Sequence, residues 1–310
     1  MIKRAQNKVA ESRYTLLWAA LFGIAVWALC GLATHQLWVQ FACFVLSVFL
    51  INQLGSVNAL IRIYSQTVPA MFIALSCASC FIFPSLKGGI AQLCMVCSLF
   101  TLTCTYQDRR SPGWTFYTYM FLAMASLVEI HVLWFVPVYL LMAIFFYYSI
   151  SWRTSMAAVL GLLMPYWFYA TWTLWQHGSD FTTFVSHFYP VFDIGSSAML
   201  VTQLPIAQLL SAGLLVVVAI TGVIHYLRNS YGDKVRVRQL YYSLIFLNIT
   251  ATTLLLLLPQ HIDLMIRLMI ITASPLAAHF LTLTHTRITN VAFYALMATV
   301  IILTAINLWN

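Results

Sequence analysis

The sequence predicts an all-α integral membrane protein, a polytopic helix bundle, and three observations support this fold class. Hydrophobic residues make up 62% of the chain and charged residues only 7%, whereas soluble domains carry roughly a quarter charged residues. Apolar runs of about 17 to 24 residues recur along the chain, long enough to cross a hydrocarbon core of roughly 30 Å as helices. No polar stretch is long enough to bury a core of its own, so we expect residues 1–310 to form a single transmembrane domain.

The individual spans follow from breaking the chain at proline, glycine and clusters of charge. After a basic arm at residues 1–13, the first apolar run is too long for a signal peptide and has no small-x-small cleavage site, so we interpret it as a retained helix. About eleven spans result, near residues 14–34, 38–54, 67–84, 88–105, 114–130, 132–150, 154–176, 204–227, 239–258, 264–283 and 290–309.

Particular residues predict how some of these spans pack. Ala157 and Gly161 have the four-residue spacing of a close helix contact, and Pro165 predicts a kink after it. Pro275 predicts a second kink, with His279 facing the bundle either as a hydrogen-bonded residue or as a proton relay.

The distribution of basic residues predicts the orientation, because cytoplasmic loops of membrane proteins collect Lys and Arg. A cytoplasmic N-terminus and an outside C-terminus leave only Lys87 and Arg267 away from the inner side. The net charge of +8 then mostly reflects this topology, and no nucleic-acid partner is expected. The residues on the inner side are Lys3, Arg4, Lys8, Arg13, Arg62, Arg109, Arg110, Arg153, Arg228, Lys234, Arg236, Arg238 and Arg287.

Titratable groups concentrate on the predicted outer side. The stretch "LVEIHVLW" places Glu129 and His131 between two apolar runs, where a carboxylate is costly unless it lies at a surface, in a cavity or beside a partner. Two residues apart, they do not share a face of an unbroken helix and therefore need a turn or different partners. In "QHIDLMIR", Asp263 and Arg267 do share a face, either as a structural ion pair or as part of a ligand or catalytic site.

The longest outer segment, residues 177–203, alternates aromatic with polar residues. This composition suits a piece that lies along the interface or re-enters between helices, and it equally suits an ordinary loop with an aromatic belt. This segment adds the ligand-binding candidates Asp180 and His187. His261, on another outer turn, is a third candidate.

The sequence predicts no metal site and no cofactor. Two CxxC patterns, Cys77 with Cys80 and Cys94 with Cys97, lie in consecutive spans at similar depth, which would suit four thiolate ligands. We interpret them as small buried residues, because no polar second shell accompanies them. The chain also has no Walker P-loop, no GxGxxG and no HExxH motif.

From Asn58 to Trp175 the chain runs through "NALIRIYSQTVPAMFIALSC", an apolar pair, "YQDRRSPGW", the helical pair around Glu129, and "SWRTSMAAVLGLLMPYWFY". This order resembles a family of uncharacterised bacterial inner-membrane proteins and, more loosely, the helical core of GT-C polyprenyl-phosphate-sugar glycosyltransferases. The resemblance implies an outward-facing site for a lipid-linked sugar. Those enzymes typically carry a catalytic acid in the first outer loop, whereas "THQLWVQ" here holds His35 and no carboxylate, so no catalytic residue is carried over.

Three functional interpretations remain. In the first, the protein serves envelope glycan or lipid-linked sugar chemistry, either as an enzyme or as a non-catalytic relative. Its partners would then be membrane lipid and a polyprenyl-phosphate carrier, with Glu129, His131 and Asp263 as catalytic candidates and Arg267 facing a phosphate. In the second, it is a transporter or flippase, for which Asn248, Thr250 and Gln208 are sparse mid-membrane candidates. In the third, it is a structural or assembly scaffold whose charges pair locally.

Overall fold

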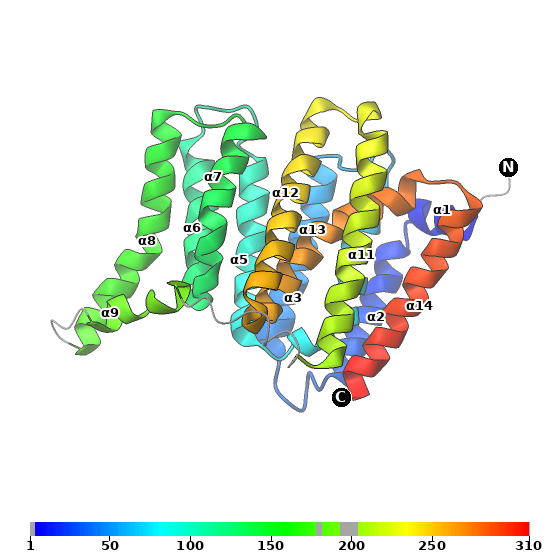
Figure 1. Ribbon diagram of the computed structural model, residues 1–310, viewed down its shortest axis with the longest axis horizontal. Helices are drawn as coiled ribbons and strands as arrows, with labels where there is room; N and C mark the ends of the chain where they lie inside the picture. The colour runs from blue at the N-terminus through cyan, green and yellow to red at the C-terminus, as the bar shows by residue number, and fades with distance from the viewer. Residues whose placement is uncertain (1–3, 178–181, 193–203, 310) are drawn as a thin grey trace.

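The computed structural model describes residues 4–177, 182–192 and 204–309, and every regular element in this part of the chain is a helix. Seven helical segments are long and apolar enough to cross a bilayer, and the bent pair α1 and α2 would make an eighth. Figure 1 shows these helices packed side by side, as in a membrane helix bundle. The elements are α1 (Ala5–Glu11), α2 (Thr15–Leu29), α3 (Trp38–Val57), α4 (Thr67–Ala78), η1 (Cys80–Ile82), α5 (Leu86–Thr103), α6 (Pro112–Val128), η2 (Ile130–Trp134), α7 (Phe135–Phe145), α8 (Trp152–His177), α9 (Thr182–Ser186), η3 (Tyr189–Phe192), α11 (Ile206–Asn229), η4 (Ser230–Gly232), α12 (Val235–Leu257), η5 (Pro259–His261), α13 (Ile262–Leu283) and α14 (Arg287–Trp309).

Each predicted span contains a helix, but three of the helices end earlier than expected. The predicted span 67–84 ends as α4 at Ala78 and is followed by the short helix η1. The predicted span 14–34 ends as α2 at Leu29, because Gly31 has a φ of 84°, which a right-handed helix cannot accommodate. The predicted span 132–150 ends as α7 at Phe145, shortly before Tyr148, whose φ is 51°. The expected break near residue 131 lies at Glu129, where the backbone is extended.

The predicted basic arm contains a short helix, α1, which meets α2 at an angle of 94°. The Gln6 side-chain amide donates to the carbonyl oxygen of Leu281 at 2.5 Å and to the hydroxyl of Thr284 at 2.7 Å. These bonds satisfy acceptors at the C-terminal end of α13, where the last carbonyls have no intrahelical donor. The arm is therefore held against the end of α13.

The core of the bundle is α13, which is buried over 94% of its apolar window. Buried residues occur on every face of this helix, as in a helix that is enclosed by others. It packs against α4, α5, α11 and α12. By contrast, only 17% of the window of α14 is buried, so its apolar surface is available to lipid tails.

The bundle has two ends, which we name by their residues. The basic end holds Arg62, Arg109 and Asp233, and the Glu129 end holds Glu129, His131 and His261. At the basic end, Ser65 donates to the carbonyl of Ala10 at 2.6 Å and Ser151 donates to that of Arg109 at 2.9 Å. At the Glu129 end, Gln40 donates to the carbonyl of Pro84 at 3.3 Å. Figure 1 shows α1 on the right in the upper half of the view, while α14 ends at the lower edge, toward which α6 and α7 also run.

Candidate functional site at the Glu129 end

Glu129, His131 and His261 lie at the same end of the bundle because the chain turns between two helices at each of two places. Glu129 follows the last residue of α6 in an extended conformation, and η2 then carries His131. Leu258 has φ −127° and ψ 61°, outside the α-helical region that a following proline disfavours, and Pro259 opens the short helix η5 that ends at His261. Of the two alternatives that the sequence left for Glu129 and His131, a turn or different partners, the structure has the turn.

Glu129, His131 and His261 form one compact group. Each offers a ligand atom, and these atoms all lie within 4.8 Å of one another. The two imidazole rings are stacked, with their centroids 3.5 Å apart and their planes at 30°. His131 is 3% exposed, whereas Glu129 and His261 are half-buried, so the group opens toward the surface on one side.

The segment after α8 covers part of this group. Nε2 of His131 lies 3.2 Å from the carbonyl oxygen of Pro190, which is in η3. A carbonyl can only accept, so this nitrogen carries the proton and Nδ1 of a neutral ring keeps the lone pair. The segment around η3 thus fixes the tautomer of His131. The residues beyond η3, 193–203, lie outside the described part of the chain.

Arg267 is held by three partners inside the protein. Its Nε lies 3.2 Å from Oδ1 of Asp263, one nitrogen donates to Oε1 of Gln92 at 2.9 Å, and another donates to the carbonyl of Ile82. The residue is only 3% exposed. The adjoining cavity encloses about 10 Å³, about the minimum for one water molecule. This geometry favours the structural ion pair over a phosphate-binding role.

Glu129 lies in a polar environment in spite of its partial burial. Burial raises the pKa of its carboxyl, and the nearby charge of Asp263 raises that pKa further, while Lys87 and Arg267 lower it. Glu129 is in the break between α6 and η2, outside both helices. A positive charge beside Glu129 would therefore be stabilised by two carboxylates at once.

The other predicted ligand candidates do not join the group among the described residues. The His187 ring packs against that of Tyr169, with the ring centroids 5.1 Å apart, and burial lowers its pKa. Asp180 lies outside the described residues.

The cysteines of the two CxxC patterns are all free thiols. Cys80 lies beside Cys30, which directly follows α2, whereas Cys94 lies near Cys43 of α3. In the described ranges, the group around Glu129 is the one place where three or more potential metal ligands meet. The four cysteines of the two CxxC pairs therefore do not come together as one set of metal ligands.

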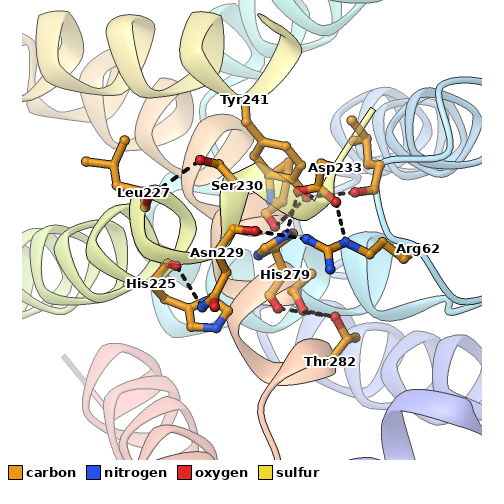
Figure 2. A network of polar contacts seen from close by, with 12 residues as sticks. Arg62, His225, Leu227, Asn229, Ser230, Asp233, Tyr241, His279 and Thr282 are labelled. Atoms are coloured by element: carbon orange, nitrogen blue, oxygen red, sulfur yellow. Dashed lines mark hydrogen bonds and ion pairs between the residues drawn. The ribbon is translucent and has the colours of Figure 1, made fainter. Parts of the chain in front are cut away.

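Sequence reasoning missed a buried network at the basic end, which Figure 2 shows. Asp233, 8% exposed, lies between the Nε of Arg62 at 2.6 Å and Nε2 of His279 at 3.3 Å. Arg62 also donates to the carbonyl of Asn229 at 2.9 Å. His279 is thus a bundle-facing, hydrogen-bonded residue. The signal available in the sequence was that Asp233 is the only acid in the basic stretch 228–238.

The Glu129 end therefore offers a carboxylate and two imidazoles, which can exchange protons or coordinate a cation. Comparisons of the chain with protein-family models, curated proteins and solved structures found no match.

Proposed function

We propose that the chain crosses a bacterial inner membrane eleven times, with its N-terminus in the cytoplasm and its C-terminus outside. Eight crossings are the seven long helical segments and the α1–α2 pair, and the other three are the shorter helices α4, α6 and α7. The positions of the basic residues support this orientation, since Lys87 and Arg267 lie near Glu129, whereas Arg62 pairs with Asp233 and Arg109 bonds to Ser151 at the basic end. The basic end then faces the cytoplasm. The Glu129 end opens outside.

On this topology, the function we propose is binding of the phosphate-bearing head group of a lipid-linked sugar carrier, a polyprenyl phosphate, in envelope glycan metabolism. The observation that carries the proposal is the convergence of Glu129, His131 and His261 at the outer end of the bundle. Half-buried side chains at this end lie at the depth of lipid head groups, and the exposed Lys87 adds a positive charge nearby. Arg267 contributes indirectly, by holding Asp263 in place.

The transport alternative receives less support from the contacts of its mid-membrane candidates. Asn248 donates to the hydroxyl of Thr272 at 2.7 Å, and Thr250 donates to the carbonyl of Phe246 in its own helix at 2.9 Å. Two of the mid-membrane polar residues are therefore paired locally. A transport path needs polar groups that face a continuous route.

Binding to the purified protein in lipid nanodiscs would test this proposal. We expect the wild-type protein to bind a short-chain polyprenyl phosphate at least about 10-fold more tightly than the matching polyprenol, because charge-assisted bonds to phosphate are the stronger ones. Lys87→Ala and His261→Ala should reduce this preference, because they remove a nearby positive charge and a ring that can donate to the phosphate. Lys234→Ala is the control, since this exposed cation lies at the basic end.

Equal affinity for the alcohol and the phosphate would contradict the proposal. The proposal would also be contradicted if Lys234→Ala lost the preference while the two site variants kept it. Binding would then reflect the general attraction of the basic end for anionic lipid.

A further inference from the structure

We propose that Glu129, His131 and His261 form a binding site for a divalent metal ion of the zinc class. The ligand set is two imidazoles and one carboxylate, which is a combination that proteins use for Zn²⁺ with a fourth position left open. The three side chains come from two turns that are more than a hundred residues apart in the sequence, and folding brings their ligand atoms within 4.8 Å of one another.

The distances permit this assignment after a small movement. Ligands at about 2.0–2.2 Å around a tetrahedral ion are roughly 3.4 Å apart. The ligand atoms must therefore draw together by at most about 1.5 Å, which side-chain rotation can supply. The two stacked rings must swing apart as they turn their nitrogens toward a common point, and the half-buried His261 is the ring with room to do so.

The surroundings supply the second shell that such a site needs. Metal-bound histidines usually donate their other ring nitrogen to a carbonyl or carboxylate, which fixes the ring and raises its basicity. His131 already donates from Nε2 to the carbonyl of Pro190 at 3.2 Å, which is a contact of this kind. Asp263 adds a second negative charge near Glu129.

The charge balance also suits a cation. Glu129 and Asp263 face Lys87 and Arg267, so the side chains other than histidine carry no net charge, and the guanidinium of Arg267 is occupied by its own partners. A divalent ion would make the site positive and able to hold an anionic oxygen in its open position. That last step rests on the proposed function, in which the anion is the phosphate of a polyprenyl carrier.

Metal content of the full chain, purified in detergent and freed of metal with a chelator, would test the site. We expect the wild-type protein to bind one Zn²⁺ per chain in a calorimetric titration, and Co²⁺ to give the visible absorption of a tetrahedral complex. Glu129→Gln and His261→Ala should each weaken Zn²⁺ binding by more than the roughly 10–100-fold that loss of a second-shell partner costs. His187→Ala is the matched control, as a histidine of the same end outside the group.

His131→Ala is a third variant, and size-exclusion chromatography checks that each variant is folded. Because Glu129 and His261 are half-buried, their variants decide the matter if His131→Ala does not fold. Absence of wild-type binding at 100-fold molar excess of Zn²⁺ would overturn the proposal. Equal binding by the wild type, Glu129→Gln and His261→Ala would do the same.

The two proposals can fail separately. Zinc binding that depends on the three residues, without a preference for polyprenyl phosphate over polyprenol, would support the metal site and overturn the lipid-carrier function. A phosphate preference that survives chelation, in a protein that binds no Zn²⁺, would support the function and overturn the metal site.

Discussion

At the scale of single residues, Arg267 shows how a cation is accommodated inside an apolar bundle. Its guanidinium bonds to a carboxylate, an amide oxygen and a backbone carbonyl from three different segments. A buried guanidinium needs such partners, since burial without them costs several kcal/mol. Arg267 thereby ties the start of α13 to α5 and to η1.

Replacing Arg267 with alanine should therefore destabilise the protein. The change leaves the amide oxygen of Gln92 and the carbonyl of Ile82 without this donor, at a cost of about 2 to 4 kcal/mol in the free energy of unfolding. Denaturant titration in detergent micelles measures this change. Lys87→Ala, at an exposed position of the same end, should stay within about 0.5 kcal/mol of the wild type. Equal stability of the two variants would contradict a structural role for Arg267.

At the scale of helices, close approach depends on small residues. A side chain added at Gly161 in α8 would overlap the backbone carbonyl oxygen of Phe116 in α6 and would come within 3.2 Å of the backbone nitrogen of Met120. Backbone atoms cannot rotate away as a side chain can. The contact that Ala157 and Gly161 predicted in the sequence is therefore an α6–α8 contact, and α8 continues as a helix through Pro165.

Gly161→Ala and Gly213→Ala should have opposite effects. Alanine is favoured over glycine inside a helix by roughly 0.5–1 kcal/mol, but at position 161 the separation of α6 and α8 should cost about 1 to 3 kcal/mol. Gly213 in α11 has no atom within 4 Å of the added carbon, so Gly213→Ala should be neutral or stabilising. Thermal unfolding of both variants in the same detergent measures the difference. A Gly161→Ala protein as stable as Gly213→Ala would show that the helices do not need this close approach.

At the scale of the whole molecule, the two ends of the bundle are chemically different. The basic end holds most of the Lys and Arg residues together with the Asp233 network, and the Glu129 end holds the histidine and carboxylate group. Between the two ends, exposed apolar side chains such as Trp167 and Ile301 present a surface to lipid tails. Membrane insertion would place the two ends on opposite sides.

The orientation predicts which introduced cysteines an impermeant maleimide can reach in intact spheroplasts. Thr34→Cys and Lys87→Cys should be labelled, because the proposed orientation places both of these exposed positions outside. Arg110→Cys and Thr286→Cys should be labelled only after the membrane is permeabilised. The parent protein with its native cysteines sets the background. Labelling of Arg110→Cys in intact spheroplasts would overturn the cytoplasmic placement of the basic end.

The sequence by itself determined the class of the protein and the helical segments, because hydrophobic run length and composition are local properties that need no partner. It also determined that Asp263 and Arg267 share a helix face, since their four-residue spacing lies within one helix. The break at Glu129 followed in the same way, from two polar residues that an unbroken helix would place on different faces.

Only the tertiary structure decided which distant residues meet. It placed His261 against His131, showed that Arg267 is enclosed by Gln92 and Ile82, and assembled Asp233 with Arg62 and His279. Each of these contacts joins residues from different helices or turns. Hydropathy records how deeply a segment is buried, but it carries no information about which neighbour a segment packs against. The physical reason is that helix packing in a bundle is set by the fit of side chains across the interface between helices.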